Sequence, residues 1–568
     1  MNVGSPIQSP GAARMSSRSP EEFRLGASPY DRGPGRGKEP EDAYELLRRA
    51  RRLTAEGHPS AGGAWERAAP ALWRVGGSLT PGDHADALDA TAFACRGRAR
   101  QAAAPLFSRA ADLHERSGQH GKALVSRARA LLGAPEPGAT VCAGLGELGK
   151  RATALHAVGR ATAAETATVL LLRCRARADL LDTGPDPVAE AAALRADLAR
   201  LVSFVAPHRT SPAALGVLAE ARTLLGRVTA PDDPAAALVH LRTAMADHRA
   251  GGRPWPAAEG VLLLTGLLRA TGARQEAAAL LRAALGTTAS RGCRADRARL
   301  CLALARTPAG APGRPAGDEE VSLLGEAVRH ADSVAGDGRL SVLARLALGI
   351  ARAERGRWRQ ASALLREVLS GLAEAEAGDG DCYGYGYGHE AARVRAGAWL
   401  AFCALGLGEP GRAAREFARV AAEARRWDDL RHGAALSELT ARALGAAGSP
   451  EKAARAHERA ADLWRSAGDH AAAARSLRTR ARQVRKAWGA AAAEVVEAEA
   501  RREAGRARPG DGEGPAGLRA WLRGLPEPYG PPGRYQVDVY GEVGGAGTGP
   551  LGPRRREEQE VTRVQGCV

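Results

Sequence analysis

Apolar residues recur at intervals of three and four from residue 41 to about residue 506. Runs of roughly 12 to 16 residues rich in Ala, Leu and Arg are separated there by short Gly or Pro breaks. A three-and-four spacing places apolar side chains on one face of a helix, and Gly and Pro end helices. The pattern therefore predicts consecutive antiparallel helices, each of which buries one face against its neighbours.

The two ends of the chain follow a different pattern. Residues 1–40 are rich in Ser, Pro, Gly and Arg and have no apolar period, which predicts a disordered arm. Residues 507–568 are rich in Pro and Gly, and only Arg534–Tyr540 alternates as a strand would. One isolated strand does not make a domain. We expect a helical domain over residues 41–506, framed by disordered termini.

A local pattern repeats around seven glycines: Gly118, Gly159, Gly272, Gly356, Gly408, Gly448 and Gly468. Five positions after them stand alanines: Ala123, Ala164, Ala277, Ala361, Ala413, Ala453 and Ala473. Seven positions before them stand small residues: Ala111, Ala152, Thr265, Gly349, Ala401, Ala441 and Ala461. Nine positions after them, four residues are large and apolar and three are not: Leu281, Leu365, Phe417 and Leu477, against Arg127, Thr168 and His457. Small residues let two antiparallel helices approach, and a larger one fills the groove to the next hairpin.

The segment Leu348–Leu369 resembles a tetratricopeptide repeat in its Leu-Gly pair, its turn glycine and its Ala-x3-Leu-x2-Val second helix. Trp399–Ala424 and Leu439–Trp464 follow the same plan, with Leu-Ala and Thr-Ala in place of the Leu-Gly pair. The resemblance is clearest over residues 259–484. It implies an all-α, right-handed solenoid of stacked antiparallel helix hairpins, about eleven in number, that binds a partner on its concave surface.

The spacing of the turn glycines departs from that family. Intervals of 41 (118 to 159), 84 or twice 42 (272 to 356), 52 (356 to 408) and 40 (408 to 448) residues compare with about 34 in the standard repeat. The 52-residue interval exceeds the 40-residue one by 12, which is the length of Gly378–His389, so this segment reads as an insertion between hairpins. Gly448 and Gly468 are only 20 residues apart, so one of them must join one hairpin to the next.

The insertion also resembles a calcium-binding loop. Asp379, Asp381, Gly384 and Glu390 take the first, third, sixth and twelfth positions of such a loop. Tyr383 occupies the fifth position and cannot supply a carboxylate, and glycines at the eighth and tenth leave the loop poorly preorganised. A flexible surface loop is therefore the favoured interpretation, with calcium binding as the alternative.

Other motifs give little support to catalysis. Gly144–Arg151 matches a phosphate-binding loop up to Lys150, but Arg151 replaces the hydroxyl residue that would hold magnesium, and no buried strand precedes it. We expect an ordinary helix there. The histidines form no H-E-x-x-H motif, His114–His120 lacks ligand spacing, and no G-x-S-x-G elbow is present. We expect no enzyme activity, no cofactor and no metal.

Charge and cysteine content bear on the partner and the compartment. The net charge is +17 and the pI about 10.1, from 81 basic residues of which only five are lysines. Such a preference for arginine is typical of GC-rich codon usage and favours a diffuse basic surface. The eight cysteines form no C-x-x-C pair, and no signal peptide or membrane-spanning run is apparent. We expect a cytoplasmic protein that does not enter a membrane.

One basic segment stands apart from this diffuse charge. Residues 475–486 contain six basic residues and no acidic one, and a helix would align four of them as one stripe, which we call the arginine stripe: Arg475, Arg478, Arg482 and Arg485. The stripe suits phosphates or an acidic protein. The favoured alternative is a solvated helix face, partly neutralised by the acidic run Glu494–Ala500.

The leading functional prediction is a non-enzymatic scaffold or adaptor that binds a protein or peptide partner on the concave repeat surface. The alternative, from another class, is a nucleic-acid-associated regulator that uses the arginine stripe, although no DNA-binding module or ATPase is recognisable beside the repeats. The sequence does not identify the partner, the oligomeric state, or whether the tail orders on binding.

Overall fold

The computed structural model describes most of the residues of the predicted helical domain and a few of the tail. The described residues are 43–55, 64, 67–68, 80–95, 100–133, 138–251, 257–288, 294–307, 317–333, 338–377, 386–424, 430–507, 522–523, 525, 534–535 and 537.

Twenty-one α-helices follow one another over these residues. The first half of the chain contains α1 (Ala43–Ala55), α3 (Pro81–Cys95), α4 (Arg100–Arg116), α5 (His120–Gly133), α6 (Gly138–Ala157), α7 (Ala163–Leu180), α8 (Pro187–Val205), α9 (Pro212–Thr229), α10 (Pro234–Ala250), α11 (Ala257–Ala270) and α12 (Arg274–Thr288). Short 3-10 turns, η2 (Leu181–Thr183) and η3 (Ala206–His208), follow α7 and α8. The second half contains α13 (Arg294–Ala305), α14 (Asp318–Asp332), α15 (Gly338–Glu354), α16 (Trp358–Ala377), α17 (Gly386–Gly406), α18 (Pro410–Ala424), α19 (Leu430–Ala446), α20 (Pro450–Ser466), α21 (His470–Trp488) and α22 (Ala490–Ala504).

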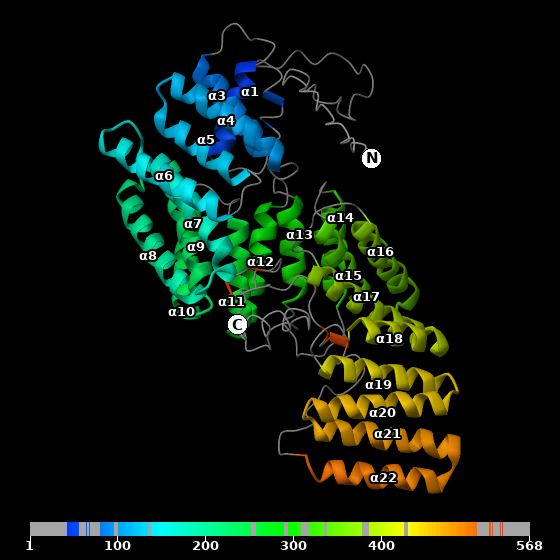
Figure 1. Ribbon diagram of the computed structural model, residues 1–568. Helices are drawn as coiled ribbons and strands as arrows, with labels where there is room; N and C mark the ends of the chain where they lie inside the picture. Colours follow the sequence, from blue (N-terminus) through cyan, green and yellow to red (C-terminus); the bar gives the residue numbers. More distant parts are fainter. Residues whose placement is uncertain are drawn as a thin grey trace, which may run out of the picture.

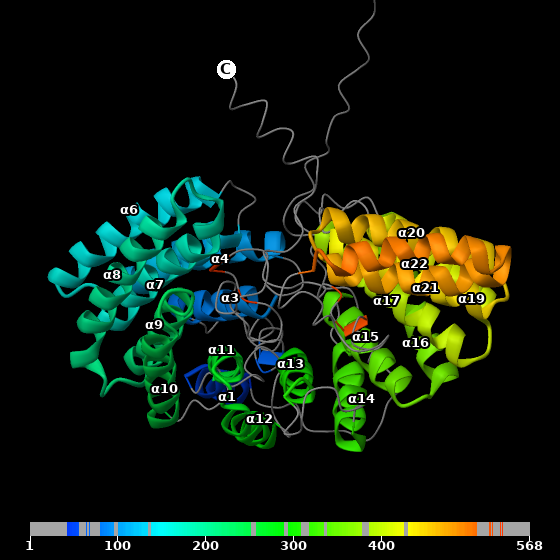
Figure 2. The ribbon, with the colours of Figure 1, turned by 90° about the horizontal axis from the view of Figure 1, so that it is seen from below.

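These helices form an arch that continues into a flatter stack (Figure 1). Helices α6–α10 make one arm, α11–α14 the bend, and α15–α18 the start of the other arm, which ends in the parallel layers of α19–α22. Seen along the arch, α9, α11, α13 and α15 lie toward its middle, and α10, α12, α14 and α16 lie outside (Figure 2). Helices two apart contact each other along this inner layer, as α7 does α9 and α15 does α17. The predicted all-α solenoid of stacked hairpins is confirmed.

All seven glycines of the sequence pattern lie in turns between consecutive helices, with φ between 71° and 85°. Glycine has no Cβ, so it adopts this left-handed conformation without the steric penalty of other residues. In every case the next residue donates its amide hydrogen to the carbonyl five positions earlier, as Arg357 does to Arg352 at 2.9 Å. This is the Schellman arrangement that closes a helix C-terminus. Gly448 and Gly468 end α19 and α20, so one of them does join successive hairpins.

The expected packing of small against large residues is visible between α15 and α16. A Cβ added to Gly349 would lie 3.1 Å from both Cγ and Cδ2 of Leu365, which is fully buried. Leu281, Phe417 and Leu477 are also buried at the same position after their glycines. Glycine at position 349 therefore allows the two helices to close on the leucine.

The pattern departs from expectation at two places. After Gly159, α7 begins four residues later, whereas after the other six glycines the next helix begins two residues later. The cause is Thr162, which caps α7 with a capping box to Glu165. As a result Thr166 is buried, and Ala164, five positions after the glycine, is half-buried. In α20, His457 occupies the apolar position and is 1% exposed, so this histidine is part of the core.

Candidate functional site

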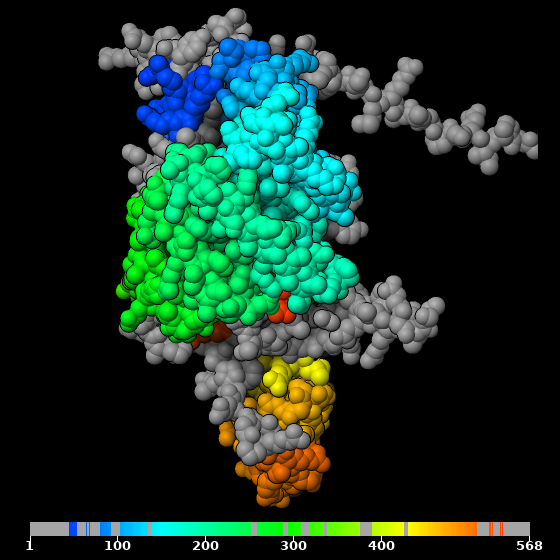
Figure 3. Space-filling view, turned by 90° about the vertical axis from the view of Figure 1, so that its left-hand side faces the viewer, coloured from blue at the N-terminus to red at the C-terminus, as the bar shows by residue number. Residues whose placement is uncertain are grey.

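Described residues of the C-terminal tail lie on the inner side of the arch, against helices far away in the sequence. Leu522, Leu525 and Tyr535 are all buried. Figure 2 shows the tail segments between the two arms, and Figure 3 shows red tail atoms at the lower edge of the green helices. Leu522 and Leu525 pack into the cluster around α16–α18, and Tyr535 packs into the cluster of α7, α8 and α9. We call these two places the Leu525 site and the Tyr535 site.

The Tyr535 site holds the tail backbone by hydrogen bonds in both directions. The Tyr535 amide donates to both carboxylate oxygens of Asp182, at 3.2 and 3.1 Å, just after the end of α7. The Nε of Arg227, on α9, donates to the Tyr535 carbonyl at 3.3 Å. A donor and an acceptor of the same residue are thus bound, as happens when a peptide docks through its main chain.

Side chains complete the Tyr535 site. The tyrosine ring is fully buried, and its hydroxyl donates to Asp232 Oδ2 at 3.4 Å. The other carboxylate oxygen of Asp232 accepts from the guanidinium of Arg534, and Arg195 also donates to this carboxylate. Asp232 follows α9 in the turn to α10, so the residues that bind the tail come from the ends of neighbouring hairpins.

The electrostatics of the Tyr535 site favour a negative Asp232 and a neutral tyrosine. Burial opposes ionisation of Asp232, but the hydrogen bond from Arg195 and the charge of Arg534 outweigh it, so its pKa is lowered. Burial, followed by the nearby charge of Asp232, raises the pKa of Tyr535. The tyrosine hydroxyl therefore remains a donor to a charged carboxylate, a strong type of hydrogen bond.

The Leu525 site joins the tail to the opposite arm. Arg395, on α17, is buried and donates to the Leu525 carbonyl at 2.6 Å. Arg523 Nε donates to Glu354 Oε1 at 2.6 Å, at the end of α15, where the glutamate side chain is 8% exposed. Burial, then the charge of Glu354, raises the pKa of Glu320, and Arg523 acts in the opposite direction. The positive charge of Arg523 thus offsets the repulsion between the neighbouring carboxylates of Glu354 and Glu320.

Sequence reasoning missed both tail sites. The expectation for residues 507–568 gave no residue of the tail a place in the core. The one signal in the sequence is the alternation of Arg534–Tyr540, which predicts an isolated strand. Val537 is half-buried against the cluster of α10 and α11, and residues 538–540 lie outside the described ones. Nothing in a single sequence pairs Tyr535 with Asp182, because 353 positions separate them.

The arginine stripe lies on α21 as predicted. Arg478, Arg482 and Arg485 are exposed and Arg475 is half-buried. Arg485 pairs with Glu497 at 2.7 Å, within the acidic run, whereas Arg478 and Arg482 have no carboxylate partner among the described residues. Trp488, at the end of the stripe, is 51% exposed. The partial neutralisation anticipated from the sequence therefore applies to Arg485.

The other candidate motifs are settled to different extents. Gly144–Arg151 lies inside α6, and Lys150 pairs with Glu147 at 2.7 Å on the exposed face, so this segment forms helix and no phosphate loop. Asp379, Asp381 and Gly384 of the calcium-like loop lie outside the described residues, and Glu390 lies in α17. Over the described part of the chain, no group of three or more His, Cys, Asp or Glu could hold a metal ion.

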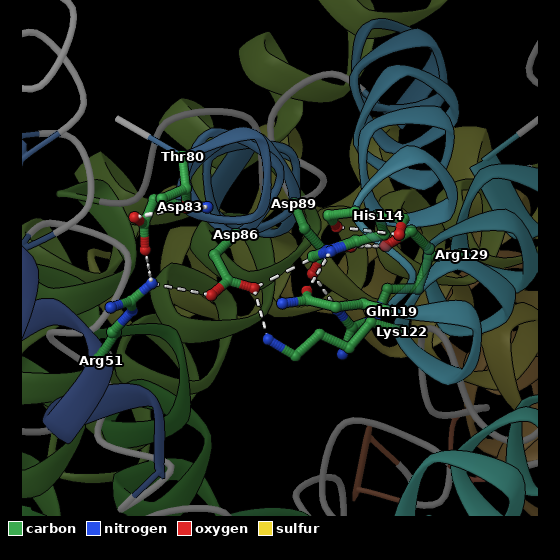
Figure 4. A network of polar contacts seen from close by, with 11 residues as sticks. Arg51, Thr80, Asp83, Asp86, Asp89, His114, Gln119, Lys122 and Arg129 are labelled. Atoms are coloured by element: carbon green, nitrogen blue, oxygen red, sulfur yellow. Dashed lines mark hydrogen bonds and ion pairs between the residues drawn. The ribbon is translucent and has the colours of Figure 1, made fainter. Parts of the chain in front are cut away.

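In a polar network of α1, α3 and α5, the negative and positive charges of the side chains balance one another (Figure 4). Arg51, on α1, pairs with Asp83 and Asp86 of α3 at 2.6 and 3.0 Å. Lys122, on α5, pairs with Asp86 at 3.0 Å, and Arg129, on the same helix, pairs with Asp89. Three carboxylates thus meet three cations. This network ties α1, α3 and α5 together and is structural.

The histidines of this region, His114 and His120, belong to local pairs. His114 Nδ1 lies 2.9 Å from Gln119 Oε1, and His120 Nδ1 lies 2.9 Å from Glu115 Oε1. Burial lowers the pKa of His114.

The described cysteines are free thiols with little reactivity. Burial raises the pKa of Cys174, Cys301 and Cys403 to about 11, so they are protonated at neutral pH. Among the helices that the structure describes, none combines the length and the apolar character that crossing a membrane requires.

Comparison with known proteins adds fold similarity and no more. No family model and no curated protein sequence matches this chain. The chain resembles tetratricopeptide-repeat proteins in fold. A putative kinesin light chain from Podosopora anserina with TPR-like repeats is 18% identical, with 37% of this chain and 94% of that chain covered and a TM-score of 0.30.

Two further solved structures cover more of the chain. Yeast Tom70 is 10% identical, with 81% of this chain and 96% of that chain covered and a TM-score of 0.29. A signal-transduction ATPase with a tetratricopeptide repeat sensor from Pyrococcus horikoshii is 11% identical, with 81% and 55% covered and a TM-score of 0.30. At such scores the whole-chain overlap is small, and the fold assignment rests on the hairpins and turns of this chain itself.

Proposed function

We propose that this protein is a non-enzymatic interaction scaffold that binds a protein or peptide partner on the inner side of the arch, which is its concave surface. The observation that carries the proposal is the tail itself. At Tyr535 a short stretch of chain is held there by two main-chain hydrogen bonds, a buried aromatic ring and an arginine on a carboxylate. A surface that binds one short segment in this way has the donors, acceptors and apolar contacts to bind another.

The neighbourhood of this surface supports binding over catalysis. Three of the four described thiols are buried, burial raises the pKa of all four, and Asp182, Asp232 and Glu354 of the tail sites each accept from an arginine or an amide. A general base or a nucleophile needs an accessible, activated group. We place the protein in the cytoplasm on the basis of these free thiols, which suit a reducing compartment.

An affinity capture from the native cytosol tests the scaffold function. The full chain should retain a discrete protein partner, and Asp182→Asn and Asp232→Asn together should reduce its recovery. The matched control is Glu451→Gln, which changes an exposed carboxylate at the start of α20 on another part of the molecule. Recovery of no protein above background, or equal recovery by all variants, contradicts the proposal.

A second function is favoured by the two exposed arginines without carboxylate partners, Arg478 and Arg482. They would let the protein bind nucleic acid through phosphates, with an affinity that falls steeply with salt. A mobility shift of random duplex DNA at low salt, lost in the Arg478→Glu/Arg482→Glu variant, would support it. If the unmodified chain shifts no DNA, this second function is excluded.

A further inference from the structure

The Arg534–Tyr535 dipeptide fits its site in main chain, side chain and charge at once. The amide and carbonyl of Tyr535 are bonded by Asp182 and Arg227, and the ring is fully buried. Arg534 lies with its guanidinium 5.8 Å from the tyrosine ring and pairs with Asp232. A neutral aromatic residue in an apolar cluster, preceded by a basic residue on a carboxylate, is a specific combination.

Charge makes this combination selective. The whole chain carries +17, yet the described residues that receive the side chains of two tail arginines are acidic: Asp232 at Arg534 and Glu354 at Arg523. A carboxylate at such a position favours a basic residue there and disfavours an acidic one. Each of the two sites is therefore matched to a basic residue at the position of the tail arginine that it binds.

We propose that Asp182, Arg227 and Asp232 form a recognition site for a basic residue followed by an aromatic one in a partner protein, presented in a turn as Arg534 and Tyr535 are, and that Arg534–Tyr535 is its internal occupant. The partner displaces the tail. This deepens the proposed scaffold function and rests on it for the existence of a partner. The recognised chemistry is an arginine or lysine next to a tyrosine or phenylalanine.

Tethering explains why the tail would hold the site until a partner arrives. Leu525 is held at the Leu525 site, and Arg534 follows nine positions later on the same chain. A segment linked to its site on the same chain has an effective concentration there of about 1 mM. A free peptide with a Kd of about 1 μM therefore binds the unmodified protein at least about ten-fold, and up to about a thousand-fold, more weakly than a protein whose site is empty.

A synthetic peptide with the sequence of residues 531–539 is the probe. Its affinity is measured for the unmodified full chain, for the Arg534→Ala/Tyr535→Ala full chain, and for the latter with Asp232→Asn added. We expect about ten-fold or tighter binding by the second protein than by the first, and a loss of at least about ten-fold on adding Asp232→Asn. Asp462→Asn is the matched control, because Asp462 lies on the exposed face of α20 and, among the described residues, pairs with its near neighbour Arg465 alone.

Several results would overturn the inference: equal affinity for occupied and emptied sites, binding unaffected by Asp232→Asn, or equal binding of a peptide with Ala at both motif positions. A dimer in light scattering that dissociates in the Arg534→Ala/Tyr535→Ala variant would assign the tail to a second copy and overturn the intramolecular form. If that variant misfolds by circular dichroism, excess peptide should instead raise amide exchange at residues 534–535 of the unmodified chain, and unchanged exchange counts against displacement.

The scaffold proposal and this inference fail separately. A cytosolic partner captured equally by the unmodified chain and the Arg534→Ala/Tyr535→Ala variant, with no peptide binding, leaves the scaffold function and overturns the recognition site. Peptide binding with the expected variant pattern, together with no partner from the cytosol, supports the site and contradicts the scaffold function.

Discussion

The arch of α6–α17 and the stack of α19–α22 follow one repeat plan but present different surfaces. Along the arch, tail residues lie on the inner side, where Arg523 and Arg534 meet acidic partners. In the stack, the exposed face of α21 carries Arg478 and Arg482 with no such partner within the described residues. The core differs at one helix of the stack, because the position that holds Leu365 in the arch holds His457 in α20, whereas α21 has Leu477 there. Repeat packing fixes the backbone, while individual residues decide what each region can bind.

A large side chain at position 349 should destabilise the arch, because α15 and α16 approach each other closely there. Gly349→Leu would force a branched side chain into Leu365, and we expect a loss of about 3 kcal/mol in the free energy of unfolding. The matched control is Gly371→Leu on α16, where a Cβ would meet nothing within 4 Å, so stability should be unchanged or higher by up to about 1 kcal/mol. Chemical denaturation measures both. Equal effects of the two substitutions would contradict the packing.

The tail should stabilise the arch through charge at the Leu525 site. Arg523→Met keeps an apolar stem but leaves Glu354 beside Glu320 without the guanidinium, and we expect a loss of about 1 to 2 kcal/mol at pH 7. The pKa of Glu320 is already raised, so this carboxyl takes up a proton first as the pH falls, and the repulsion disappears. The difference between variant and unmodified protein should therefore shrink toward acid pH. A difference that does not change with pH would rule out this electrostatic origin.

The stack should gain stability when its core position is made like that of the arch. Both ring nitrogens of His457 are buried and have no hydrogen-bond partner among the described residues, and burial lowers the pKa of this histidine to about 4. His457→Leu should raise the free energy of unfolding by about 1 kcal/mol at pH 7.

The effect of His457 should also depend on pH. The unfolded histidine has a pKa of about 6.5, so between about pH 6.5 and pH 4 the unfolded chain binds more protons than the folded one. The contribution of the neutral ring to stability is complete above about pH 6.5 and is lost as the pH falls toward 4. His457→Leu should remove this acid sensitivity, and the reciprocal Leu365→His should create it in the arch. Thermal unfolding from pH 4 to 8 measures both, and parallel pH profiles for all three proteins would refute the explanation.

The smallest effect on stability is expected at the arginine stripe. Arg478→Glu/Arg482→Glu should change the free energy of unfolding by less than about 0.5 kcal/mol, because both side chains are exposed. If the stripe binds an anionic partner, the same variant should lose that binding. A loss of stability of several kcal/mol would mean that the stripe is structural.

The sequence predicted the framework well because repeat packing leaves local marks. Turn glycines, small residues and large apolar residues lie at short, fixed separations, and all seven glycines are in the expected turns. The repeat pattern gave the wrong start for α7, because the capping box of Thr162 makes this helix begin at Ala163. It could not find the Tyr535 site, since Asp182 and Tyr535 meet through the tertiary fold and carry no mark of one another in the sequence.

The central claim is that Arg534 and Tyr535 of the isolated protein lie on the inner side of the arch. Hydrogen–deuterium exchange over residues 534–537 tests it most directly, because the Tyr535 amide donates to Asp182 and its ring is buried. The unmodified chain should protect this segment, and Asp182→Asn with Asp232→Asn should reduce that protection while exchange in α19–α22 stays the same. Exchange of the segment at the rate of an unstructured peptide in the unmodified chain would contradict the account.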